Sequence, residues 1–160
     1  MNKYFIAINN TNYMISQLLN LDRIKIVQSI TDWKESIHVV AEPLIKDESI
    51  SSQYVDSIFK STYELGPYYV LAPKIAMPHA RPHEGANKNA LSLLIVKEGV
   101  SFHSEENDPV HLILLLSAQG SNEHIEIITS IADFFGNDHD IEKVIAAQSD
   151  QDILEILKQH

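Results

Sequence analysis

The residue best placed for chemistry is His79, which follows Pro78 in the segment GPYYVLAPKIAMPHARPHEG, residues 66–85. Four of the six prolines of the chain fall in this segment. Each proline removes a backbone donor and drives the residue before it towards extended geometry, so we expect extended pieces joined by turns rather than a helix. An imidazole held there is mostly neutral at pH 7 and could serve as a nucleophile or phosphoryl acceptor. A loop histidine bonded to nearby backbone is the alternative, and the local sequence does not decide between them.

Two neighbours bear on the role of His79. In an extended segment Arg81 emerges on the same side as His79, where its guanidinium could pair with phosphate oxygens; a surface arginine is the alternative. A metal site of His79, His83 and Glu84 requires a helix to bring both imidazoles to one face, and the neighbouring prolines oppose a helix. The chain has no cysteine and no HExxH pattern. We therefore predict no metal.

A second candidate, His124, lies at the start of an apolar helical pattern that ends at Gly136. Ser121 is the expected N-cap, which makes His124 the third helical residue. The spacing of residues 124, 128, 131 and 135 points the imidazole along the buried face. At this end of a helix, free N–H groups and the helix dipole favour an anion, and a histidine can donate a hydrogen bond to phosphate. A partly exposed histidine on an amphipathic helix is the alternative.

The composition excludes several classes of protein. A chain of 160 residues, 44% hydrophobic, predicts one domain over residues 1–160. The net charge of −10, without a basic cluster, argues against nucleic acid and anionic membranes as partners. No P-loop, GxGxxG or GxSxG pattern is present, so we predict no nucleotide cofactor and no serine triad. The N-terminus lacks a secretory signal and the longest apolar run is only Leu112–Leu116, which predicts a cytoplasmic protein.

Hydrophobic periodicity predicts the elements that position these residues. Residues 90–97 and 110–118 are near-continuous apolar runs, which is the pattern of strands covered on both faces. Shorter strands are expected at 23–30, as an edge strand, and at 68–72 and 75–77. The expected helices cover residues 11–20, 31–45, 52–65, 121–136, 141–147 and 152–158. Because helices precede, separate and follow the buried strands, we predict an α/β fold, a three-layer α/β/α sandwich.

Beyond these patterns, residues 66–85 strongly resemble the active-site segment of phosphotransferase-system (PTS) EIIA proteins of the mannitol/fructose superfamily, type 2. The amino-acid sequence of this segment looks most like that of the ascorbate-specific branch. The later segment DPVHLILLLSAQGSNEHIEII is similar to the second signature of the family, a buried strand, a small polar loop and a helix that begins with a histidine. The resemblance runs from about Ser29 to the C-terminus and leaves residues 1–10 without a counterpart. It implies a central mixed β-sheet flanked by helices.

The resemblance also implies a function and its residues. His79 would take a phosphoryl group on Nε2 from phospho-HPr and pass it to an EIIB partner, which works with a membrane EIIC. The second active-site histidine falls on His124, and no metal, nucleotide or other cofactor takes part. Mannitol-type members carry an upstream arginine, whereas the corresponding stretch here, KSTYELG, has none. Arg81 is the candidate that replaces its positive charge.

Three functional interpretations follow from the sequence. The leading one is a stand-alone EIIA phosphocarrier of a sugar PTS permease of the ascorbate type. The second is a regulatory relative that takes the phosphoryl group but acts by binding a non-transport partner. The third is a metal-dependent hydrolase that uses the histidine cluster. The sequence reveals neither the sugar nor whether the chain is a monomer or a homodimer.

Overall fold

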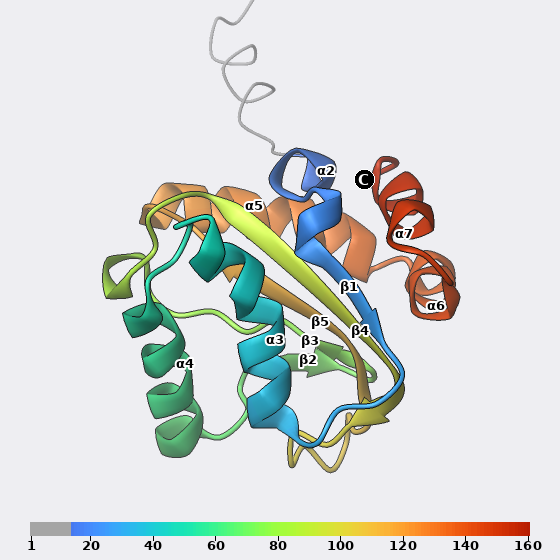
Figure 1. Cartoon of the computed structure of the whole chain (residues 1–160), viewed down its shortest axis with the longest axis horizontal. Helices are drawn as coiled ribbons and strands as arrows, with labels where there is room; N and C mark the ends of the chain where they lie inside the picture. The colour runs from blue at the N-terminus through green and yellow to red at the C-terminus, as the bar shows by residue number, and fades with distance from the viewer. Residues whose placement is uncertain (1–13) are drawn as a thin grey trace, which may run out of the picture.

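The computed structural model describes residues 14–160, so residues 1–13, including the unassigned residues 1–10 and the start of the helix expected at 11–20, lie outside it. Five strands form one mixed sheet with the order β1-β4-β5-β3-β2 (Figure 1). β1 runs parallel to β4 and β3 parallel to β5, whereas the β4–β5 and β2–β3 pairs are antiparallel. The expected mixed sheet is confirmed.

The two central strands are the apolar runs that the sequence singled out. The strands are β1 Ile24–Val27, β2 Val70–Ala72, β3 Ile75–Ala76, β4 Ala90–Val100 and β5 Val110–Ser117. The first seven residues of β4 are all buried, as are the last six of β5, because helices cover both faces of the sheet. β1 lies at one edge, as its short alternating pattern predicts.

Helices cover both faces of the sheet. They are α2 Ile15–Leu18, α3 Trp33–Lys46, α4 Ser52–Leu65, α5 Ser121–Phe135, α6 Asp138–Ala146 and α7 Asp150–Leu157, with 3-10 turns at Leu21–Arg23 and Pro82–Glu84. α3 and α4 lie on one face, and α2, α5, α6 and α7 lie on the other (Figure 1). The predicted three-layer α/β/α sandwich is confirmed. Among residues 14–160, no helix is long and apolar enough to cross a membrane.

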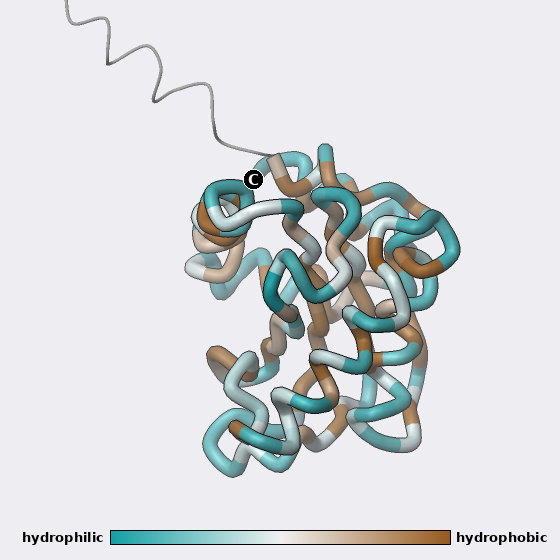
Figure 2. Tube along the Cα trace, turned by 90° about the vertical axis from the view of Figure 1, so that its left-hand side faces the viewer, coloured by the Kyte–Doolittle hydropathy of each residue, from teal (hydrophilic) through white to brown (hydrophobic). Residues whose placement is uncertain are grey.

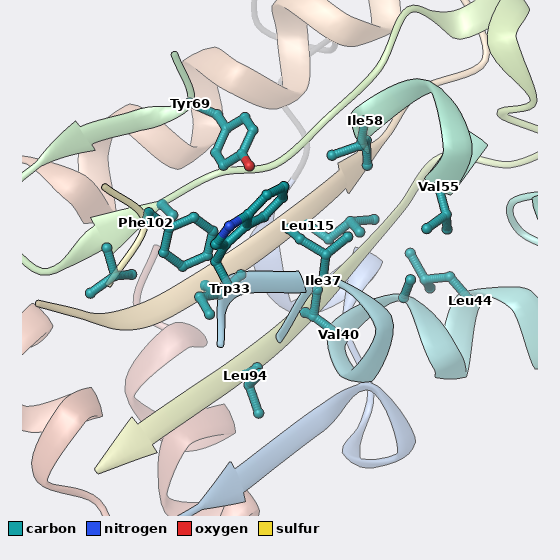
Figure 3. Close-up of a cluster of buried hydrophobic side chains, with 14 of the residues drawn as sticks. Trp33, Ile37, Val40, Leu44, Val55, Ile58, Tyr69, Leu94, Phe102 and Leu115 are labelled. Carbon is teal, nitrogen blue, oxygen red and sulfur yellow. The ribbon is translucent and has the colours of Figure 1, made fainter. Parts of the chain in front are cut away.

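Two hydrophobic cores hold the layers together, one on each face of the sheet. Along β4, Leu94 belongs to the core under α3 and α4, whereas Leu93 and Ile95 belong to the other core, because successive strand residues point to opposite faces. Figure 3 shows the first core, in which Trp33 and Ile37 of α3 pack towards the sheet. In Figure 2, hydrophobic stretches of the trace run through the middle of the molecule, whereas hydrophilic residues are common in the outer loops.

The first turn of α5 differs from the sequence prediction. The N-cap is Gly120 rather than Ser121, so His124 is the fourth helical residue. The buried face is formed by Ile127, Ile131 and Phe134, whereas Ile125 is 63% exposed. The segment 125–135 is apolar over a wide arc, so spacing alone allows more than one buried face, and the contact with the sheet selects one.

Candidate active site

The loop that carries His79 is anchored through its carbonyl groups. The Met77 carbonyl accepts a hydrogen bond from Nδ1–H of His79 at 2.8 Å, and the Pro78 carbonyl accepts one from the backbone N–H of Leu116 in β5 at 3.1 Å. The next two carbonyls, of His79 and Ala80, lie within hydrogen-bond distance of tyrosine hydroxyls. Four successive carbonyls are therefore paired outside any strand ladder, which restricts the loop to one conformation.

The two tyrosines come from α4 and from the residues just after it. The hydroxyl of Tyr68 donates to the His79 carbonyl at 2.9 Å. The buried hydroxyl of Tyr54 lies 2.6 Å from the Leu116 carbonyl and 3.2 Å from that of Ala80. Tyr54, which is fully buried, therefore connects the end of β5 to the loop.

The C-terminal side of the loop docks against the start of α4. Pro82 begins a single 3-10 turn, Pro82–Glu84. The first residue of a helical turn has no hydrogen-bond acceptor for its N–H within the turn, so a proline there costs no hydrogen bond. The prediction that the proline-rich segment forms no helix is therefore confirmed for residues 66–85, apart from this one 3-10 turn. Gly85 follows with φ +121°, and a Cβ there would collide with the hydroxyl of Ser51 and lie 3.1 Å from the backbone nitrogen of Tyr54. Glycine is thus required by both conformation and space.

The hydrogen bond at Nδ1 determines which nitrogen of His79 can react. A carbonyl oxygen only accepts, so Nδ1 must carry the proton that it donates to the Met77 carbonyl. Nε2 of the neutral ring then holds a free lone pair. Burial lowers the pKa of His79 below its ordinary value of 6.5, against the opposing effect of the Met77 bond. The ring is therefore neutral at pH 7, with Nε2 as the nucleophilic atom.

His124 lies beside His79, as the sequence predicted. The centroids of the two rings are 5.3 Å apart. Burial, and in second place the charge that His79 can carry, lower the pKa of His124. The sheet topology explains why the two histidines lie close together. The His79 loop follows β3, His124 follows β5, and these two strands are parallel neighbours. Their carboxyl ends therefore open onto the same edge of the sheet.

Both histidines line one surface hollow of about 560 Å³, in which Arg81 also takes part. Arg81 thus lies on the same side as His79, as an extended segment predicts. The full lining consists of Lys60, Ser61, Glu64, Leu65, Tyr68, His79, Ala80, Arg81, Pro82, Glu84, Ser121, His124 and Ile125. His83 is not part of it, and residues 14–160 hold no group of three or more His, Cys, Asp or Glu side chains that could bind a metal ion.

The sequence analysis missed three residues of this site, Lys60, Tyr54 and Tyr68. Lys60 adds a second cation to the lining of the hollow, and its signal was its place on α4 as the first residue of KSTYELG, the stretch without arginine. For Tyr68 the signal was an aromatic residue within the proline-rich segment. A nucleophilic nitrogen, a second imidazole, two cations and the free N–H groups at the start of α5 together form a site that can hold and transfer a tetrahedral oxyanion.

A family comparison gives the context of this site. Residues 17–160 match the model of the family described as "Phosphoenolpyruvate-dependent sugar phosphotransferase system, EIIA 2". Over 120 residues the chain is 39% identical to SgcA of Escherichia coli (strain K12), which is named as a phosphotransferase IIA component; the match covers 75% of this chain and 84% of that protein. The ascorbate-specific PTS system EIIA component of the same strain is 30% identical over 126 residues, 78% of this chain and 82% of that one.

Solved structures show the same fold. The mannitol-specific cryptic phosphotransferase enzyme IIA CmtB from Escherichia coli superposes with a TM-score of 0.85 at 32% identity, over 92% of this chain and 100% of that one. A complex of enzyme IIAMTL with phosphorylated enzyme IIBMTL from Escherichia coli gives a TM-score of 0.77 at 27% identity, over 89% and 98% of the two chains.

Proposed function

Because this chain belongs to the EIIA type 2 family of the sugar phosphotransferase system, we propose that it is a phosphocarrier whose phosphoryl group resides on Nε2 of His79. PTS EIIA components are phosphotransferases that transfer phosphoryl groups via a histidine. The observation that carries the assignment to His79 is its Nδ1–H bond to the Met77 carbonyl, which leaves Nε2 unprotonated beside the hollow.

The proposed reaction is an in-line displacement between two imidazoles. The Nε2 lone pair of His79 attacks the phosphorus of a donor phosphohistidine; the new P–N bond forms as the old one breaks, and the donor imidazole keeps the electron pair. The transition state is loose, with charge spread over three equatorial oxygens. His124, Arg81 and Lys60 line the same hollow and supply hydrogen bonds and positive charge to those oxygens. Attack by the acceptor then reverses the step and returns neutral His79.

We propose phospho-HPr as the donor and an EIIB protein, acting with a membrane EIIC, as the acceptor. EIIA components work with an EIIB partner, and a solved complex of this kind contains a structural relative of the chain. Such a carrier would act in the cytoplasm, where HPr is found. A regulatory protein that binds a non-transport partner is the alternative, and it is distinguished by the absence of transfer to any EIIB cysteine. Whether the chain is a monomer or a homodimer is to be measured by light scattering. The residues that line the hollow all come from one chain.

The sugar is a separate proposal. The sequence of residues 66–85 favours an ascorbate-like carbohydrate. Over the longer alignment, however, a mannitol-specific cryptic relative is 35% identical to this chain and the ascorbate-specific component 30%. Parallel transfer reactions with EIIB proteins of the two systems separate them. Faster transfer to the ascorbate-type EIIB is expected, and faster transfer to the mannitol-type protein contradicts the proposal.

The phosphorylation site is tested with enzyme I, HPr and phosphoenolpyruvate. His79→Ala is expected to abolish stoichiometric labelling, because it removes the imidazole whose Nδ1–H bond to the Met77 carbonyl leaves Nε2 free to accept the phosphoryl group. His83→Ala is the matched control from the same loop and is expected to label normally. Retained labelling of His79→Ala overturns the assignment. For His124→Ala, the label is expected to enter while onward transfer slows by about 100- to 1000-fold, the cost of losing one transition-state donor; an unchanged transfer rate removes His124 from the mechanism.

A further inference from the structure

Tyr68 touches the proposed phosphorylation site in two independent ways. Its hydroxyl donates to the carbonyl of His79 itself at 2.9 Å. Its ring meets the imidazole nearly at right angles, with centroids 5.7 Å apart and an interplanar angle of 86°. We propose that Tyr68 is a positioning residue for phosphoryl transfer, which fixes the direction in which Nε2 of His79 points. This inference rests on the function proposed above.

The two hydrogen bonds of His79 restrain it on opposite sides. The bond from Nδ1–H to the Met77 carbonyl restrains the ring, and the bond from Tyr68 restrains the peptide group between His79 and Ala80. Without the second bond, rotation about the Cα–C bond of His79 is restrained only by more distant anchors, and the imidazole can swing with its backbone. A displacement of about 1 Å in a reacting group can slow a reaction by about 100-fold.

Tyr68 is itself held firmly enough to position another residue. Its ring packs edge-on against Tyr69, with centroids 5.1 Å apart, and it is the second residue of the tight turn in which Val70 N–H bonds to the Pro67 carbonyl at 3.0 Å. Burial raises the pKa of Tyr68, with a smaller opposing effect of a hydrogen bond with Ser61. The hydroxyl therefore remains protonated, and so remains a donor, throughout the neutral pH range.

A neutral donor suits this place better than a cation. The Tyr68 hydroxyl satisfies a backbone carbonyl without adding charge beside an imidazole that must stay unprotonated. The positive charge of the hollow comes from two other lining residues, Lys60 and Arg81. Orientation and charge stabilisation are thus assigned to different residues.

The test compares Tyr68→Phe with Tyr69→Phe. Tyr69→Phe removes the same hydroxyl one residue later in the chain, where it pairs with Thr62 and not with the loop. For Tyr68→Phe, the maximal rate of labelling by phospho-HPr is expected to fall about five- to tenfold, the equivalent of one hydrogen bond. KM for phospho-HPr is expected to stay unchanged, because the ring is kept. Tyr69→Phe is expected to match the wild type in both constants.

Two further measurements separate positioning from docking. Phosphoramidate is a small donor that phosphorylates histidine with loss of ammonia and needs no protein surface. A positioning role slows labelling by phosphoramidate and by phospho-HPr equally, whereas slowing with phospho-HPr alone overturns the proposal and assigns Tyr68 to partner contact. In ¹⁵N NMR spectra of the His79 ring, the wild type is expected to show one tautomer, protonated on Nδ1, and Tyr68→Phe a mixture of both.

The outcomes distinguish this inference from the function on which it rests. If the wild type is not labelled on His79 by either donor, the proposed function fails. If the wild type is labelled normally and Tyr68→Phe matches it in rate and in tautomer, only the positioning role fails. Phenylalanine keeps the ring contacts with His79 and Tyr69, so the fold is retained. Tyr68→Leu is a second variant without the hydroxyl and is expected to be slowed at least as much.

Discussion

His79 combines a free nucleophilic nitrogen with an environment that keeps it free. The Met77 carbonyl occupies Nδ1, and burial makes protonation of the ring unfavourable. An exposed histidine near its ordinary pKa would spend part of its time protonated at neutral pH and would exchange tautomers. Under the proposed function, one hydrogen bond and burial therefore keep Nε2 of His79 available for reaction without a separate general base.

The pH dependence of labelling tests this preparation. Because the pKa values of His79 and His124 are both lowered, the labelling rate is expected to stay level from about pH 8 to pH 6.5 and to fall only below that range. The unfolded chain binds these protons at higher pH than the folded chain, so stability falls in the same acidic range. NMR titration of the two rings gives the pKa values directly. A rate that already halves between about pH 7.5 and 6.5 contradicts the prediction.

At the scale of the element, the loop after β3 is positioned by side chains rather than by a strand ladder. The hydroxyls of Tyr54 and Tyr68 and the backbone of Leu116 pair with three of its carbonyls. Gly85 then lets the chain pass directly over the start of α4, where Ser51 N–H bonds to the Gly85 carbonyl at 3.0 Å. The loop and α4 therefore act as one rigid unit.

A pair of glycine variants tests the contact between the loop and α4. Gly85→Ala introduces both an unfavourable φ and a collision with Ser51, whereas Gly66→Ala, at φ +77°, meets nothing within 4 Å. Gly66→Ala is expected to lower the free energy of unfolding by about 1–3 kcal/mol through strain alone. Gly85→Ala is expected to lower it by about 1–3 kcal/mol more through overpacking. It is also expected to slow labelling of His79, because the displaced loop carries the imidazole.

Urea denaturation of both variants and one labelling assay suffice for this comparison. Equal stability losses for the two glycine variants, with equal labelling rates, mean that the close approach of Gly85 to α4 does not position the loop.

Much of this element could be predicted from its residues, and the rest depended on distant contacts. The prolines around His79 indicate an extended loop, and the strand–loop–histidine pattern places His124 at a helix start. The hydroxyl bonds of Tyr54 and Tyr68 join residues 26 and 11 positions apart, and no local pattern specifies them. The helical stripe predicted for α5 was correct at Ile131, and Ile128 and Phe135 pack against the same core. It missed the buried Ile127 and Phe134, because only the contact with the sheet decides which residues of an apolar helix are covered.

On the scale of the whole molecule, the sheet topology brings the site together. The two histidines are separated by 45 positions in sequence, yet each follows one of two parallel neighbours, β3 and β5. The two apolar cores fix the sheet against both helical layers, so the loop of His79 and the start of α5 are held at a constant separation. The site therefore lies at one edge of a rigid framework, and α5 connects that edge to the far end of the molecule.

The far end of α5 is held by an ionic contact that titrates. The side chain of His160, only 5% exposed, lies 2.7 Å from Asp133 at Nδ1 and 2.7 Å from Asp140 at Nε2. Burial alone would lower the pKa of His160, but the hydrogen bonds and charges of the two carboxylates outweigh it and raise the pKa. The folded chain therefore binds this proton more tightly than the unfolded chain. The resulting stabilisation is fully present below about pH 6.5 and is lost as the pH rises through the raised pKa.

His160→Gln is expected to lower the free energy of unfolding by about 2 kcal/mol near pH 6, because it removes hydrogen bonds to charged groups and leaves two carboxylates facing one another. The difference from the wild type is expected to shrink as the pH rises through the raised pKa of His160, because the imidazole then loses its proton in the folded state as well. His139→Gln, which replaces an exposed histidine next to Asp140, is the matched control and is expected to leave the free energy of unfolding unchanged. A difference for His160→Gln that is independent of pH would mean that the side chain acts by packing against Phe134, its ring neighbour at 5.3 Å, rather than by its charge.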